Sequence, residues 1–302
     1  MAVFVNTNYS ALQGQRYLNN VNNSLTTTYQ RLSSGMRINS AKDDAAGLQI
    51  ADRLTSQING LNQGNRNASD GIALAQTIES GIDEISGMLQ KIRTLAVQAA
   101  NGTNTKEDRD ALGKEASALV AEMQRISQQT TYGGKKILKG AKQDDSIYTK
   151  DDTNGSKGGK LVLQVGSNKG DTISFSVANF TFSVLAKNGS AGFTTTKETS
   201  KGGAITFSTG GAEALIQSMD KIIAAVDSQR ADLGALQNRL ESSIRNQSNV
   251  AANEADARSR IRDADFAEES ANLSQQSIIQ QAAASMLMQA NTRPQLGLSL
   301  LG

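Results

Sequence analysis

The sequence has 302 residues, of which 38% are hydrophobic but only 4% aromatic, and its formal net charge is +2. This length allows one large domain or two smaller ones, and the scarcity of aromatic side chains favours a helical bundle or coiled coil over a compact globule. The absence of cysteine and histidine excludes disulfides, thiol nucleophiles, Cys/His metal sites and imidazole catalysis, and the weak net charge gives no argument for nucleic acid as a partner.

The first forty residues predict a short extended lead and then a helix. They contain no acid and three bases, Arg16, Arg31 and Arg37. The helix is indicated by stripe positions that recur every three or four residues, and these are Leu18, Val21, Leu25, Thr28 and Leu32. It is expected to end at Ser33-Ser34-Gly35, because glycine is a frequent C-terminal cap.

A long helix is expected from about Ala41 to Asn101, with Ser40 as its N-cap. Apolar residues keep the same rhythm along its length, which is typical of coiled-coil packing. Two polar residues, Asn65 and Glu79, lie on this stripe, and a polar residue at such a position can fix the register of a coiled coil. The expected helix contains the glycines Gly60, Gly64, Gly71, Gly81 and Gly87. Each weakens a helix by roughly 1 kcal/mol relative to alanine, so packing against other elements must stabilise it.

A further helix over about 106–129 is expected to begin with Thr105 as its N-cap. The centre of the chain then changes character, because apolar residues recur at every second position over residues 161–165 and again over 173–177. Alternation on both sides of a glycine-containing turn predicts a β-hairpin. Residues 187–209 are rich in Gly, Ser, Thr and Lys and are expected to be exposed.

Helical spacing returns at about Gly211, and a terminal helix follows from Phe266. Pro294, the only proline in the chain, is expected to end it. The last thirty-three residues carry one charge, Arg293. A helix with an apolar stripe and uncharged polar residues elsewhere can be enclosed on all sides without burying unpaired charge. We therefore expect the two terminal helices to pair with each other, and then with other copies of the chain.

These elements predict a mainly α fold, with a long antiparallel coiled-coil or bundle rod formed by both chain ends and a central β-hairpin region. The expected domains are a terminal domain of residues 1–40 with 260–302, a rod domain of residues 41–185 with 210–259, and a short variable surface segment at 186–209. The alternative is an ordinary four-helix bundle, but bundle helices keep a charged, solvated face. Before assembly the ends are expected to be disordered, since they bury too little surface to offset their ordering entropy.

Two patterns that could carry chemistry lack the necessary spacing. The glycine-containing stretch from Gly155 lacks the G-x-x-x-x-G-K-[ST] pattern of a phosphate loop. Acids are adjacent at residues 43–44, 144–145 and 151–152, so the members of each pair point to different sides of a helix or strand and are expected to be solvated. We expect no cofactor, no metal and no enzyme activity, and the absence of H-E-x-x-H argues against a peptidase in the central region.

Several long motifs at both ends resemble the signatures of bacterial flagellins. Near the N-terminus they are RLSSGMRINSAKDDAAGLQIADRL, NASDGIALAQ and LQKIRTLAVQAAN, and near the C-terminus ADLGALQNR, ARSRIRDAD and QANTRPQLGLSLL. The resemblance covers roughly residues 1–180 and 210–302, and it is specific because the motifs agree in order and spacing. It implies a subunit that polymerises into the flagellar filament for motility. The alternative is a hook–filament junction protein, which is built on similar terminal helices.

The resemblance also implies a route, a location and partners. The subunit is exported unfolded through the flagellar type III apparatus to an extracellular filament, which agrees with an N-terminus that lacks the features of a cleavable secretory signal. No stretch approaches the ~20 apolar residues of a membrane span, so neither membrane insertion nor nucleic acid is expected. The implied partners are further copies of the chain, an export chaperone that binds the C-terminal segment, the filament cap, hook-junction proteins and host flagellin receptors.

Residue roles follow from the same resemblance. The positions that match those read by the Toll-like flagellin receptor are Lys91, Leu95 and Glu115, and the family motif has arginine where Lys91 stands, so loss of the planar guanidinium is expected to weaken recognition. The C-terminal leucines match the part that cytosolic inflammasome receptors read, and they are Leu298, Leu300 and Leu301. Many members of the family end in arginine, whereas this sequence has Gly302 at that position. The residues expected to pack the filament core are Leu18, Val21, Leu25, Leu32, Leu273, Ile278, Ile279, Met286 and Leu287.

Overall fold

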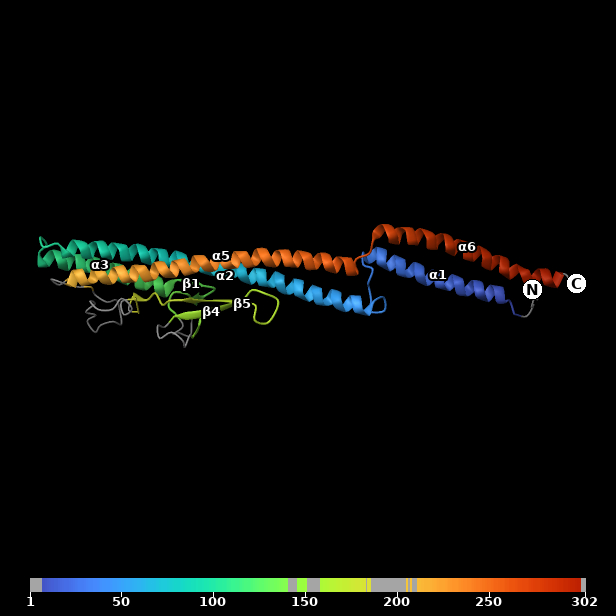
Figure 1. Ribbon diagram of the computed structural model, residues 1–302, viewed down its shortest axis with the longest axis horizontal. Helices are drawn as coiled ribbons and strands as arrows, with labels where there is room; N and C mark the ends of the chain where they lie inside the picture. The colour runs from blue at the N-terminus through green and yellow to red at the C-terminus, as the bar shows by residue number, and fades with distance from the viewer. Residues whose placement is uncertain are drawn as a thin grey trace. The chain divides into compact units, whose positions relative to one another are not determined.

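The computed structural model describes residues 7–140, 146–150, 158–182, 184–185, 205, 207 and 211–299. In this part of the chain the fold is mainly α, as expected, with short strands in the middle of the sequence (Figure 1). The helices are α1 (Tyr9–Ser34), α2 (Ala45–Ala100), α3 (Lys106–Gln129), α5 (Gly211–Arg262) and α6 (Phe266–Ser299). The strands are β1 (Thr131–Tyr132), β2 (Lys135–Lys136), β3 (Thr149–Lys150), β4 (Gly159–Gln164) and β5 (Thr172–Val177).

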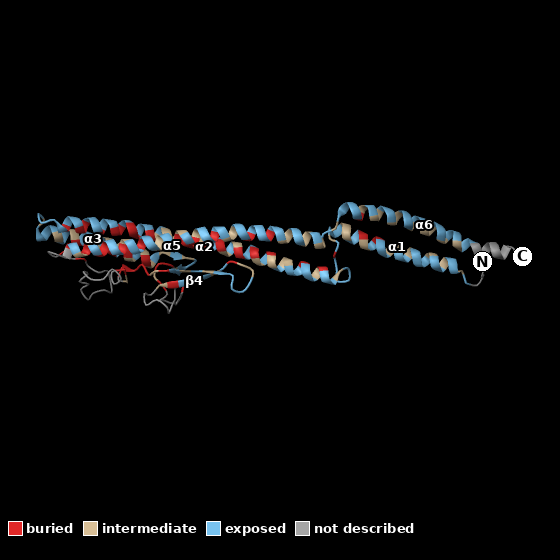
Figure 2. Cartoon of the chain, viewed as in Figure 1, coloured by how far each residue is buried: buried red, intermediate tan, exposed pale blue. Residues whose placement is uncertain are grey.

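The chain forms two compact units. One comprises residues 1–58 and 250–302, and the other comprises residues 59–249. The main hydrophobic core belongs to the second unit, where buried residues line α2, α3 and α5 (Figure 2). In the first unit, α1 buries only Leu25 and Thr28. The two units therefore differ strongly in how much apolar surface stabilises them.

In the second unit, α2 and α5 run antiparallel and are joined by polar side chains. Arg93 contacts Asp220 at 2.5 Å, and Arg230 contacts Asp83 at 3.0 Å. The two polar stripe residues expected to set register both reach α5, because Asn65 donates to the Ser248 hydroxyl at 3.4 Å and Glu79 accepts from Gln237 at 2.9 Å. Their distinct partners are consistent with the register role that the sequence predicted.

The predicted hairpin is present as β4 and β5, which pair antiparallel with Leu161 opposite Phe175 and Leu163 opposite Ile173. The edge strand β3 pairs with β4, so the sheet has three strands among the described residues. The hairpin lies on α2 at glycines: the Cβ of an alanine at residue 60 would come within 2.6 Å of Ser167, and one at residue 64 would overlap the Val165 carbonyl. These α2 glycines therefore permit close approach of the hairpin.

Two predictions are wrong: where α2 begins and where α6 ends. Helix α2 begins at Ala45 rather than near Ala41, because its N-terminal cap is Asp44, whose carboxylate accepts from the Gly47 amide at 2.8 Å, and not Ser40. Helix α6 continues past Pro294 to Ser299. A proline in a helix removes the amide that would bond the carbonyl four residues earlier, here that of Ala290, and this carbonyl accepts instead from the Asn8 side chain at 2.8 Å.

The start of α3 is as predicted. The Thr105 side chain accepts from the Asp108 amide, while the Asp108 carboxylate accepts from the Thr105 amide, forming a capping box. At the other end of α3, β1 and β2 form a tight hairpin around Gly133 and Gly134, whose φ angles are 57° and 78°. Positive φ at both central residues is the conformation that glycine adopts without strain.

Candidate assembly interface

Helices α1 and α6 lie side by side and antiparallel (Figure 1). Along the line where they meet, buried and half-buried residues recur every three or four positions on each helix. We call this set the terminal seam. On α1 it comprises Ala11, Gly14, Leu18, Val21, Leu25, Thr28 and Arg31, and on α6 it comprises Glu269, Leu273, Gln276, Gln280, Ala283, Leu287 and Ala290.

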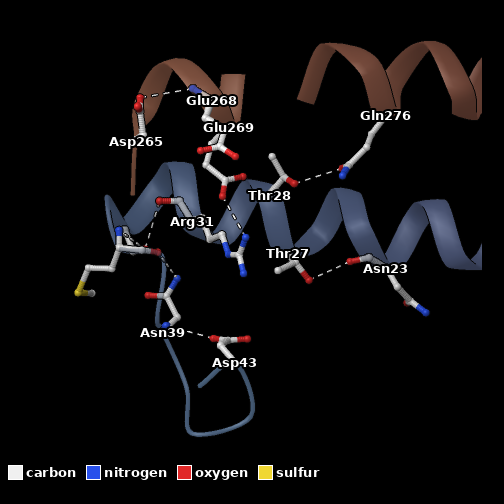
Figure 3. Close-up of polar contacts among 12 residues, drawn as sticks. Asn23, Thr27, Thr28, Arg31, Asn39, Asp43, Asp265, Glu268, Glu269 and Gln276 are labelled. Atoms are coloured by element: carbon white, nitrogen blue, oxygen red, sulfur yellow. Dashed lines mark hydrogen bonds and ion pairs between the residues drawn. The ribbon is translucent and has the colours of Figure 1, made fainter. Parts of the chain in front are cut away.

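Most of the terminal seam is apolar, and the polar side chains that interrupt it are mainly uncharged. The Thr28 hydroxyl donates to Gln276 at 3.2 Å (Figure 3), and Gln280 donates to the Asn22 side chain at 2.8 Å. One ion pair crosses the seam, between the Arg31 guanidinium and the Glu269 carboxylate at 3.0 Å, and Glu269 is buried (Figure 3). Neutral hydrogen bonds can be enclosed at far lower desolvation cost than charges, which explains why both chain ends carry so few ionisable groups.

The connections α1–α2 and α5–α6 lie against each other, and we call them the crossover joint (residues 35–38 and 261–264). Gly35 caps α1 with a φ of 69°. The Arg37 amide donates to the Arg262 carbonyl at 2.7 Å, and the Ala264 amide donates to the Gly35 carbonyl at 3.0 Å. Ile38 is buried beside them. These backbone bonds fix where both chain segments leave the terminal helices.

An acidic side chain organises the loop that follows the joint. The Asp43 carboxylate accepts from the backbone amide of Asn39 at 3.1 Å (Figure 3) and from that of Ser40 at 2.9 Å. These backbone hydrogen bonds, that from Ser40 foremost, hold the pKa of Asp43 below its usual value. The charged form therefore stabilises the folded loop.

Large apolar side chains are exposed mainly on the two terminal helices. We call this set the assembly surface: Tyr9, Leu12, Tyr17, Tyr29, Phe266, Ile278, Ile279, Met286 and Met288. Exposed fractions reach 72% for Tyr9 and for Met286. Over the remaining described residues the exposed large apolar side chains are Ile50, Val97, Val162 and Val250. Apolar surface concentrated in this way on a charge-poor segment is typical of a surface that another protein chain covers.

The residues expected to pack the filament core fall into two groups. Six are buried or half-buried within the chain: Leu18, Val21, Leu25, Leu32, Leu273 and Leu287. Three are exposed, to 68%, 42% and 72%: Ile278, Ile279 and Met286. The sequence predicts one apolar stripe on α6, whereas the structure separates residues buried against α1 from residues that are largely exposed within the single chain.

The polar residues that form hydrogen bonds at the seam were not predicted from the sequence. Asn22, Gln276 and Gln280 were not singled out, although Gln276 and Gln280 share the three/four spacing of Leu273 and Leu287. The same spacing would have predicted Gln276 and Gln280 if amide side chains had been counted as stripe residues. The exposed tyrosines of α1 were also missed, since nothing in their spacing marks them.

The structure describes only some of the residues expected to contact host receptors. Lys91 on α2 and Glu115 on α3 are exposed, whereas Leu95 is only 9% exposed and belongs to the core of the second unit. Leu298 lies near the end of α6, and Leu300 and Leu301 lie outside the described residues.

The expected surface segment at 186–209 lies mostly outside the described residues, and the two of its residues that are described, Ile205 and Phe207, are buried in the core. Over the part of the chain that is described, no group of acidic side chains is arranged to hold a metal ion. None of the helices described has a stretch long and apolar enough to cross a membrane.

Comparisons with known proteins match both ends of the chain to one protein family. The bacterial flagellin N-terminal helical region matches residues 5–143, and the bacterial flagellin C-terminal helical region matches residues 216–301. Flagellin A of Vibrio cholerae is 36% identical and Flagellin D of Vibrio anguillarum 37% identical, each over 100% of both chains. The first alignment spans 387 positions against 302 residues here, so this relative carries residues that this chain lacks.

A solved structure shows the same fold at lower sequence identity. It is a protein assigned as flagellar hook-associated from Vibrio parahaemolyticus, 17% identical, with a TM-score of 0.55 over 73% of this chain and 100% of the other. At this identity the likeness concerns the fold alone. The full-length similarity to named flagellins favours a filament subunit over a hook–filament junction protein.

Proposed function

Because this chain belongs to the bacterial flagellin family, we propose that its assembly surface is the part that joins one subunit to the next, while the terminal seam holds α1 and α6 of each subunit together. The family provides the structural subunit of the bacterial flagellar filament, and this chain is such a subunit, a structural protein rather than an enzyme. The observation that supports the proposal is the concentration of exposed apolar side chains on α1 and α6. Covering them with neighbouring subunits removes apolar surface from water.

The corresponding experiment compares two substitutions at exposed apolar residues. Met286→Gln alters the assembly surface, whereas Val162→Thr alters a 50% exposed residue on β4. We expect Met286→Gln to raise the critical concentration for polymerisation by about tenfold, because a buried apolar side chain contributes roughly 1.5 kcal/mol or more, and Val162→Thr to leave it near wild type. Sedimentation and electron microscopy measure both. Equal critical concentrations for the two variants would contradict the proposal.

We further propose export of the unfolded chain through the flagellar type III apparatus, with the extracellular filament as its destination. The sparse burial along α1 supports this route, because a helix that buries two residues is easily unfolded. The proposed partners are a chaperone that holds the C-terminal segment before export, and the filament cap and hook-junction proteins at the two ends of the polymer. Secretion by a strain lacking the flagellar export apparatus, assayed in the culture medium, would contradict this route.

Recognition by host flagellin receptors is proposed for two regions. Lys91 and Glu115 are exposed on the second unit, which suits contact with a Toll-like receptor, whereas the burial of Leu95 limits it to a supporting role under its neighbours. The C-terminal leucines Leu298, Leu300 and Leu301 are proposed for the inflammasome receptors, which meet the unassembled chain.

A further inference from the structure

A single side chain connects the start of α1 to the one carbonyl of α6 that Pro294 leaves without its helical donor. Asn8 is the N-cap residue of α1, where its Oδ1 accepts from the Ala11 amide at 3.1 Å. The other end of the same amide, Nδ2, donates to the Ala290 carbonyl on α6 at 2.8 Å. Both hydrogen-bonding ends of Asn8 are therefore used, one within α1 and one across the terminal seam.

The Ala290 carbonyl is a specific acceptor because of Pro294. In a regular helix this oxygen would accept from the amide of residue 294, but proline has no amide hydrogen. Helix α6 nevertheless continues to Ser299, so this carbonyl lies inside a helix without its usual donor. A half-buried carbonyl without a partner is destabilising, and Asn8 supplies the partner.

We infer that Asn8 and Pro294 act as a pair that sets the register of the terminal helices. The inference rests on the role of these helices in filament assembly. Sliding α6 by one turn would place a carbonyl already bonded within its own helix opposite Asn8, and would leave that of Ala290 unpaired. In the correct register the Asn8 side chain forms hydrogen bonds with both the Ala11 amide of α1 and the Ala290 carbonyl of α6.

The chemistry of the amide separates this role from simple capping. Asn, Asp and Ser cap helices about equally well. Aspartate in place of Asn8 would keep the acceptor but present a second oxygen to the Ala290 carbonyl, so two acceptors would face each other. Serine would keep the acceptor without reaching across. A residue that only caps would tolerate both replacements.

The test measures critical concentrations of the full chain carrying Asn8→Ser, Asn8→Asp and Pro294→Ala. We expect Asn8→Ser to raise the critical concentration about threefold to tenfold, as loss of one hydrogen bond predicts, and Asn8→Asp to raise it further. In the Pro294→Ala background, where the residue 294 amide bonds Ala290, Asn8→Ser should have little effect. Hydrogen exchange of the Ala11 amide in filaments reports whether the cap is kept.

The outcomes are distinguishable. Failure of the wild-type chain to polymerise contradicts the proposed function, and with it the inference that rests on that function. Polymerisation by the wild type with equal critical concentrations for Asn8→Asp, Asn8→Ser and wild type overturns the inference, because Asn8 is then a cap alone. Additive effects of Asn8→Ser and Pro294→Ala also overturn it, since paired residues are coupled in a double-mutant cycle.

Discussion

At the scale of single residues, the capping box of α3 predicts a defined pH dependence. The pKa of Asp108 is lowered by hydrogen bonds from the Thr105 side chain and backbone. A folded-state pKa below the unfolded value of about 3.9 means that Asp108 stabilises the fold above that value, and that this contribution is lost as the pH falls through the lowered pKa.

Asp108→Asn tests that dependence. We expect the variant to be less stable than wild type at pH 7, and the difference to disappear in acid as Asp108 of the wild type is protonated. Denaturant unfolding at several pH values measures it. Asp110→Asn, two residues along the same helix, is the control because no capping contact involves that residue. A difference that grows in acid would contradict the assignment.

Lys91 carries a prediction about receptor recognition. It is exposed on α2, and the resemblance to flagellins implies arginine at its position. Arginine presents a planar fork of donors that lysine lacks. We expect Lys91→Arg to increase activation of the Toll-like flagellin receptor severalfold in a reporter assay, whereas Lys114→Arg on α3, also exposed, should leave it unchanged. Equal effects of the two substitutions would remove Lys91 from the proposed contact.

At the scale of elements, the glycines of α2 divide into those that the fold requires and those that it does not. A Cβ at residue 64 would overlap the Val165 carbonyl, whereas one at residue 87 would meet nothing within 4 Å. We expect Gly64→Ala to destabilise the chain by about 1–3 kcal/mol through overpacking. Gly87→Ala should stabilise it by roughly 0.8–1 kcal/mol through helix propensity. Thermal unfolding followed by circular dichroism measures both, and shifts of the same sign would contradict this division.

Elements were predicted from the sequence wherever one periodicity dominated. The stripes of α2, α3 and α5 and the alternation in β4 and β5 depend mainly on apolar residues, and these elements appear as expected. Helix ends were harder, because several capping residues compete locally: Ser40, Asp43 and Asp44 are all plausible caps, and the structure uses Asp44. The end of α6 was missed because a donor 286 positions before Pro294 compensates for it, and no local pattern contains that information.

The separation of α6 into two faces also could not be predicted from the chain alone. Leu273 and Ile278 are equally apolar, but only Leu273 faces α1. Which of two apolar faces a partner helix covers depends on tertiary contacts. Both faces carry apolar residues because each is covered at a different stage, one by the chain itself and one, as we propose, by other subunits.

At the scale of the whole molecule, the difference in burial between the two units predicts a difference in order before assembly. Helix α1 buries two residues, whereas the second unit has an extensive core. We expect amides of α1 and α6 to exchange hydrogen rapidly in the monomer and to become strongly protected in the filament. Amides in α2 between residues 74 and 96 should be protected in both. Strong protection of α1 in the monomer would contradict this expectation.

The terminal seam has a consequence for where such a filament can work. Besides apolar contacts, its cross-helix side-chain hydrogen bonds join hydroxyl and amide groups, which do not ionise, and Arg31–Glu269 is the ion pair across it. Dissolved salt weakens attraction between exposed charges but has little direct effect on neutral hydrogen bonds. The ion pairs between α2 and α5 are exposed and therefore more sensitive. The terminal seam is therefore expected to depend less on dissolved salt than the contact between α2 and α5.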